Sequence, residues 1–83
     1  MKERISYAFI GLEDPEQFGE AIRKFRKLRG LTQTQLAERA ECSLMYVSNL
    51  ERGKSTAELG KALRILKELD VELSLADKKG GEK

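Results

Sequence analysis

Closely spaced helix signals between residues 32 and 53 constrain the fold of this sequence more than any other feature. Thr32 and Gln35 have the spacing of a capping box, in which each side chain satisfies the other residue's backbone at a helix start. Ser43 offers a second helix cap, and Gly53 suits a left-handed helix end. We therefore predict two short helices, over about residues 33–40 and 44–52, joined by the tight linker Glu41-Cys42.

A longer helix is expected before this pair and another after it. Asp14-Pro15 is a helix start and Gly30 a stop, and apolar side chains recur between them at helical spacing. These are Phe18, Ala21, Ile22, Phe25 and Leu28. A second capping box, Ser55 to Glu58, precedes a broad apolar stripe that closes the core. The stripe consists of Leu59, Ala62, Leu63, Leu66 and Leu69.

The hydrophobic pattern changes to a period of two after Asp70. Val71, Leu73 and Leu75 alternate with Glu72 and Ser74, as in a half-buried strand. Ile5 to Ile10 alternates in the same way and could form a second strand. The predicted fold is an all-α bundle of four main helices with a short C-terminal β-strand. We expect an N-terminal arm (1–13), a helical domain (14–70), a strand (71–76) and a disordered tail (77–83).

Composition narrows the function classes. A chain of 83 residues can build one modest core and one domain. It has no histidine and a single cysteine, so zinc sites and Ser-His or Cys-His catalysis lack their essential groups, and we expect neither an enzyme nor a cofactor. No segment has the apolar length of a membrane span or a signal peptide, which favours a cytoplasmic protein with no membrane partner.

Positive charge is concentrated in the middle of the chain. Residues 22–54 contain eight basic and three acidic side chains, whereas residues 1–21 contain two basic and five acidic ones. Such clustering is typical of a surface that binds a polyanion. Two short helices braced by two others also have the geometry that places one helix in the major groove of DNA.

The helix over residues 44–52 has two distinct faces. Val47 and Leu50 are expected in the core, so the opposite face carries a set of outward residues flanked by Leu44 and Tyr46. The outward residues are Met45, Ser48, Asn49 and Arg52.

The segment LTQTQLAERAECSLMYVSNLERGK resembles the lambda-repressor-like (Xre) helix-turn-helix family, whose pattern is roughly L-T-Q-x-x-L-A-x-x-x-x-[VI]-S-x-x-x-[VI]-S-x-[LIW]-E-x-G. The following segment, GKSTAELGKALRILKELDVELSLADK, is similar to HipB-like antitoxins of that family. The resemblance covers about residues 18–78. It implies binding to double-stranded DNA, and it assigns roles by position.

The resemblance implies that Gln33 donates to a phosphate or orders a neighbouring side chain. Base or phosphate contacts are implied for Ser43, Leu44, Met45, Tyr46, Ser48 and Asn49. Arg52 and Lys54 would hold the DNA backbone, and Arg26 and Glu51 would form an internal salt bridge. The dimerisation strand would be Val71, Glu72, Leu73, Ser74 and Leu75.

Two departures from the family pattern stand out. Glu41 occupies a place where glycine is usual, because the turn commonly needs a left-handed residue; we expect a slightly different turn and a cost of about 1 kcal/mol. Leu44-Met45-Tyr46 is less polar than usual, so contacts with thymine methyl groups or readout of DNA shape would supply more of the specificity. The alternative for these three residues is packing against a partner protein.

Cys42 is expected to be a small core residue.

The resemblance further implies a homodimer on an inverted-repeat operator, with recognition helices about 34 Å apart. In HipB-like proteins the C-terminal strand pairs with its copy in the other subunit; here Ile5 to Ile10 is a competing partner. The implied function is repression of the protein's own operon and neutralisation of a HipA-like kinase toxin. The alternatives are a free-standing regulator of the same fold and a protein-interaction module.

Overall fold

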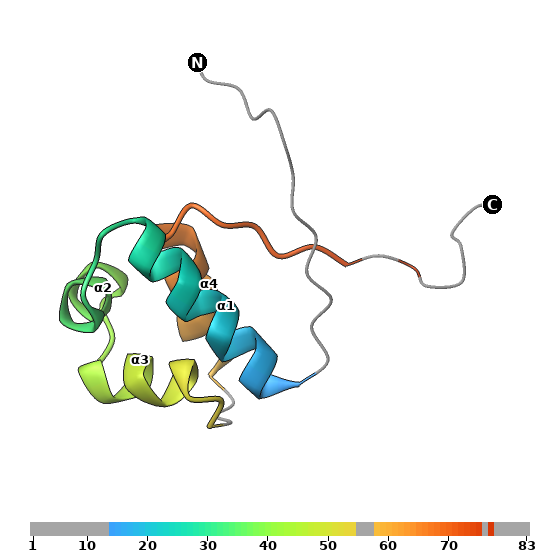
Figure 1. Ribbon diagram of the computed structural model, residues 1–83, viewed down its shortest axis with the longest axis horizontal. Helices are drawn as coiled ribbons and strands as arrows, with labels where there is room; N and C mark the ends of the chain where they lie inside the picture. The colour runs from blue at the N-terminus through green and yellow to red at the C-terminus, as the bar shows by residue number, and fades with distance from the viewer. Residues whose placement is uncertain (1–13, 55–57, 76, 78–83) are drawn as a thin grey trace, which may run out of the picture.

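Four helices form a single cluster in the computed structural model, which describes residues 14–54, 58–75 and 77. They are α1 (Pro15–Leu28), α2 (Gln33–Ala40), α3 (Leu44–Glu51) and α4 (Leu59–Glu68) (Figure 1). α3 packs against α1 and α2, and α4 packs against α2. The predicted four-helix bundle is confirmed. Within the described ranges, no helix combines the length and apolar character that crossing a membrane requires.

Local capping sets the start of the first three helices, as predicted. The Asp14 side chain accepts a hydrogen bond from the Gln17 backbone N–H at 2.9 Å, at the start of α1. Both bonds of the Thr32–Gln35 capping box are present. Ser43 Oγ accepts from the backbone N–H of Tyr46 at 3.0 Å and caps α3. The predicted box before α4 falls mostly on residues 55–57, which lie outside the described residues.

The linker between α2 and α3 keeps the left-handed geometry although its residue is not glycine. Glu41 has φ 60° and ψ 45°, in the left-handed region. The backbone N–H of Cys42 then donates to Ala37 O at 3.0 Å, which satisfies a carbonyl at the end of α2. The expectation of an altered turn is therefore wrong: the backbone adopts the usual turn and the glutamate tolerates it.

The core lies where the four helices meet. Its fully buried side chains are Ile22, Leu36, Val47, Ile65 and Leu69. Phe18 and Phe25 pack at its edge, only partly buried. Three further residues that were expected inside are exposed, namely Leu28, Leu59 and Leu63. For the two leucines of α4 the reason is that only the side of this helix that faces α2 is covered. Ile65 lies on that side and is buried in the core, whereas Leu59 and Leu63 point away from it.

Gly19 allows α1 to approach α3 closely. A Cβ atom at this position would overlap the backbone carbonyls of Leu50 and Glu51, at the end of α3. The contact therefore depends on a residue without a side chain, and it fixes how the C-terminal end of α3 sits on α1.

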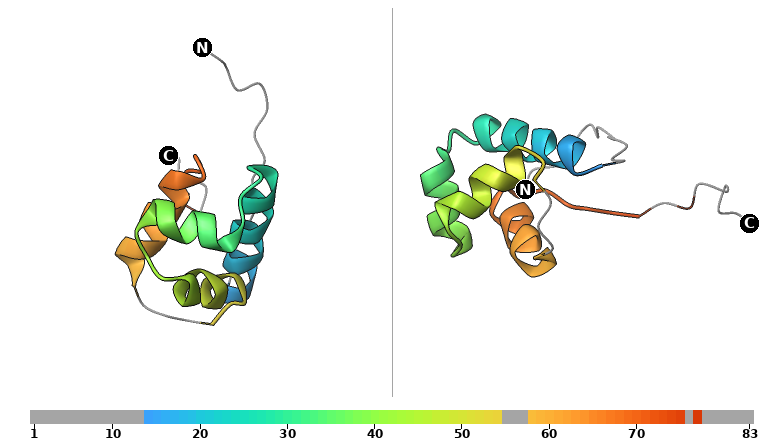
Figure 2. Two further views of the ribbon diagram at one scale, coloured as in Figure 1. Left: turned by 90° about the vertical axis from the view of Figure 1, so that its left-hand side faces the viewer. Right: turned by 90° about the horizontal axis from the view of Figure 1, so that it is seen from below.

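The chain leaves the bundle after α4 as an extended stretch (Figures 1 and 2). Val71 N–H donates to Leu66 O at 2.9 Å and its side chain packs against the core. Leu73 and Leu75 are 48% and 96% exposed, and no strand pairing occurs among the described residues of this single chain. The strand over 71–76 thus stays a prediction. The predicted N-terminal strand and nearly all of the tail lie outside the described residues.

Candidate nucleic-acid interface

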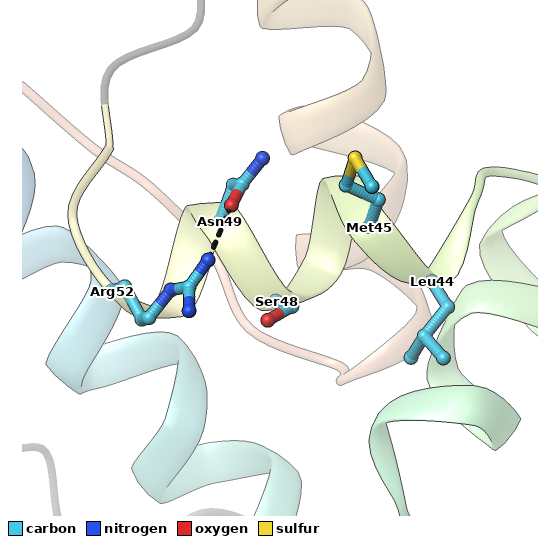
Figure 3. A pocket seen from close by; sticks show the side chains of 5 residues that line it. All are labelled: Leu44, Met45, Ser48, Asn49 and Arg52. Atoms are coloured by element: carbon cyan, nitrogen blue, oxygen red, sulfur yellow. Dashed lines mark hydrogen bonds between the residues drawn. The ribbon is translucent and has the colours of Figure 1, made fainter.

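The exposed face of α3 is the candidate interface. Leu44, Met45, Ser48, Asn49 and Arg52 line one shallow surface depression along this helix (Figure 3). Met45 is 70% exposed and Leu44 48%, while Ser48 and Asn49 are half-buried. The predicted outward face is confirmed, and its contact with DNA stays a prediction. Ser43 and Lys54, both exposed, stand just before and just after the helix.

Tyr46 does not belong to this exposed edge, contrary to the expectation. Its side chain is buried, and its hydroxyl donates to the backbone carbonyl of Glu58 at 3.1 Å. The Lys61 ammonium lies 5.4 Å from the ring centroid, and its hydrogen bond to Glu58 raises the pKa of Lys61. Tyr46 therefore connects α3 to the start of α4. Its position four residues before the buried Leu50 was the sequence signal for this role.

A buried ion pair joins α1 to the end of α3. Arg26 Nε donates to Glu51 Oε2 at 2.6 Å and Nη2 to Oε1 at 3.1 Å, while Nη1 donates to Leu31 O at 2.8 Å. The two side chains are only 10% and 3% exposed. The predicted salt bridge is confirmed, and its planar, two-point geometry fixes α3 relative to α1.

Gln33 extends this ion pair to the start of α2. Its Nε2 donates to Glu51 Oε1 at 3.0 Å, so one carboxylate accepts from side chains of both α1 and α2. Among the described residues, no buried side-chain nitrogen or oxygen lacks a hydrogen-bond partner. The link between Gln33 and Glu51 was not foreseen, because the two residues lie far apart in the sequence. A phosphate contact by Gln33 stays a prediction.

A hydrogen bond on the exposed face of α3 was also not predicted from the sequence. Arg52 Nη2 donates to Asn49 Oδ1 at 2.8 Å, and Figure 3 shows the guanidinium folded back along α3 toward Asn49. The spacing of three residues on one helix could have suggested this pair.

Cys42 lies partly buried against the core, beside the linker. Burial raises the pKa of its thiol, although the positive charges of Lys61 and Arg64 act in the opposite direction. Arg64 is engaged nearby, where its Nε donates to Ala40 O at 3.0 Å. A raised pKa keeps the thiol protonated and unreactive near neutral pH, in agreement with a packing role.

Comparisons with known proteins agree with this architecture. A family model described as helix-turn-helix matches residues 22–75. An uncharacterized HTH-type transcriptional regulator, y4mF of Sinorhizobium fredii, is 34% identical over 64 residues, which cover 77% of this chain and 84% of the relative.

Solved structures show the same fold. HipB, in a complex with HipA and O2-O3, has a TM-score of 0.76 at 27% identity, over 84% of this chain and 99% of that chain. The restriction-modification controller protein C.AhdI of Aeromonas hydrophila has a TM-score of 0.66 at 34% identity, over 71% and 86% of the two chains. The chain therefore belongs to the Xre-like helix-turn-helix family, whose members are DNA-binding transcriptional regulators.

Proposed function

We propose that this protein is a repressor that binds double-stranded DNA as a two-fold dimer and inserts α3 into the major groove. The observation that carries the proposal is the exposed face of α3 on a helix-turn-helix bundle. The buried Arg26–Glu51 pair holds the end of α3, so the helix can enter a groove as a rigid unit. Lys54 follows α3 and is exposed, as a phosphate contact requires.

The N-terminal end of α3 supplies an apolar contact. Leu44 and Met45 are the exposed apolar side chains there, and residues at this end of a recognition helix reach base edges. An apolar side chain favours the methyl group of thymine. We therefore expect thymine at the positions these two side chains reach.

Dimerisation is proposed to use the extended stretch after α4. Residues 71–75 expose Leu73 and Leu75 and make no strand pairing among the described residues. An isolated strand leaves its backbone groups unpaired, and pairing with the same segment of a second copy would satisfy them. A two-fold dimer of this kind would present two α3 helices to an inverted repeat.

The finer role that we propose is that of an antitoxin that represses its own operon and neutralises a HipA-like kinase toxin. The support is the similarity to HipB, which has been solved in one complex with HipA and O2-O3 and in others with O4 and with O1-O2. The restriction-modification controller protein C.AhdI and the clp gene regulator ClgR of C. glutamicum share the fold, which makes a free-standing regulator the second candidate.

DNA binding can be tested with a fluorescent duplex from the region upstream of the gene. Fluorescence anisotropy should show an affinity that falls at least tenfold between about 50 and 200 mM salt, because Lys and Arg displace counterions from phosphates. Replacing Ser48 and Asn49 together by alanine should weaken binding about tenfold. Lys67→Ala, on the exposed surface of α4, is the control and should bind like the wild type.

Unchanged binding by the double variant would show that the exposed face of α3 is not the DNA contact. Absence of any salt-dependent binding would favour the protein-interaction module. The antitoxin role is tested separately, by asking whether a kinase-like open reading frame adjoins the gene and whether its product co-purifies with this protein. If neither holds, the free-standing regulator is the better description.

A further inference from the structure

The hydrogen bond between Arg52 and Asn49 changes what the exposed face of α3 can recognise. Arg52 Nη2 donates to Asn49 Oδ1 at 2.8 Å, and both residues line the depression on α3. The orientation of the amide follows from the chemistry, because a guanidinium has only donors and must therefore face the amide oxygen. Among the described residues, neither side chain makes another hydrogen bond.

The joined pair presents mainly donors to a ligand. Neither N–H group of the Asn49 amide takes part in the shared bond, and Arg52 keeps further N–H groups that are not used in it. An unpaired asparagine reads adenine by accepting from the N6 amino group and donating to N7. Here one lone pair of Oδ1 is engaged by a cation, and a second donor brought to the remaining lone pair would face the positive guanidinium. Adenine and cytosine, which each present an amino group in the major groove, are therefore disfavoured.

The back-folded conformation also moves the guanidinium toward the bases. Arg52 caps the C-terminal end of α3, where a side chain extended outward would reach the DNA backbone. Its guanidinium instead bonds to the side chain of Asn49, which lies three residues nearer to the end that reads bases (Figure 3). Lys54, two residues further on, remains available for the backbone.

We propose that Asn49 and Arg52 act as one unit that reads a guanine in each half-site. Guanine is the base that presents two neighbouring acceptors, N7 and O6, in the major groove, and two converging donors match them. The inference rests on the proposed function and sharpens it. The half-site combines thymine methyl contacts at Leu44 and Met45 with a guanine contact at the opposite end of the depression.

Selection from a random duplex library tests the proposal. The wild type should select a motif with a fixed G·C pair in each half. Arg52→Ala should reduce the preference for guanine there about tenfold and raise that for adenine, because Asn49 Oδ1 becomes free to accept. Lys54→Ala is the matched control: loss of a phosphate contact should weaken binding to all sequences alike and leave the base preferences unchanged.

A second arm uses only the wild-type protein, so it does not depend on how a variant folds. Replacing the selected guanine by 7-deazaguanine removes N7 and should weaken binding about tenfold, whereas inosine keeps N7 and O6 and should bind normally. Equal binding to all three duplexes would overturn the guanine contact, as would a uniform loss in Arg52→Ala like that in Lys54→Ala; both results leave the repressor proposal intact. Failure of the wild type to select any sequence would instead refute the proposed function itself.

Discussion

Gly19 shows how one missing side chain can position a recognition helix. Its backbone lies so close to the carbonyls of Leu50 and Glu51 that a Cβ atom would overlap them. Gly60, in the first turn of α4, has open space at the same position. The two positions therefore both hold a glycine inside a helix, but only Gly60 has room for a side chain.

Gly19→Ala should lower the free energy of unfolding by about 1–3 kcal/mol, because the added methyl forces α1 away from α3. Gly60→Ala should raise it by up to about 1 kcal/mol, because alanine favours a helix and nothing stands in its way. Urea unfolding followed by circular dichroism measures both. Equal effects of the two substitutions would contradict the close approach.

The Arg26–Glu51 pair yields a second prediction at this scale. Arg26→Met leaves a carboxylate buried without its cation and should destabilise the protein by about 3–5 kcal/mol. The double variant Arg26→Met/Glu51→Leu removes both charges and should recover much of that loss. Thermal unfolding distinguishes the two variants. If the double variant unfolds as easily as the single one, the loss of stability comes mainly from losing the ion pair itself and not from leaving a buried charge unpaired.

Two helices end in a left-handed residue that is not glycine. Glu41 follows α2 and Asp70 follows α4, and each has φ 60°. The conformation disfavours residues with a Cβ atom, yet the closing hydrogen bonds, such as Cys42 N–H to Ala37 O, hold it in place. The linker therefore stores a small strain that a glycine would relieve.

Glu41→Gly should stabilise the protein by up to about 1 kcal/mol, which corresponds to a rise of about 4–8 °C in Tm per kcal/mol for a domain of this size. Glu38→Gly, at an exposed position inside α2, is the matched control and should destabilise by about 1 kcal/mol. Differential scanning calorimetry provides the comparison. A fall in Tm for Glu41→Gly would mean that the glutamate side chain stabilises the turn.

At the scale of the whole molecule, the stretch after α4 leaves the bundle (Figure 2), and the apolar side chains of Leu73 and Leu75 on it are exposed. Val71 anchors it to the core, and Leu73 and Leu75 continue beyond the helices. Exposed leucines next to unpaired backbone favour association with a second copy.

Leu73→Glu should weaken the dimer at least tenfold, because it places a charge on the apolar side of the paired strands. Ser74→Glu introduces the same charge on the alternate, polar side and should weaken the dimer much less than Leu73→Glu does. Sedimentation equilibrium measures both dissociation constants. A dimer that survives Leu73→Glu would place the interface elsewhere, with the exposed Leu59 and Leu63 of α4 as the next surface to test.

The sequence by itself determined where the first three helices begin. Asp14, Thr32 and Ser43 cap helices through bonds to backbone groups three residues away, so these signals act locally and can be recognised without the fold. The outward face of α3 followed from helical periodicity in the same way. The Arg26–Glu51 pair was expected from the family resemblance, and the structure confirms it.

Only the tertiary structure decided which residues at the edges of each helix's apolar face are buried by a neighbouring helix. Tyr46 is buried and Leu63 is exposed because α4 lies against α2 and its start lies over Tyr46, an arrangement that periodicity within one helix does not contain. The bond from Gln33 to Glu51 likewise depends on how α2 meets α3. Local hydrogen bonds set the ends of the helices, and long-range packing sets which of their faces remain free to bind.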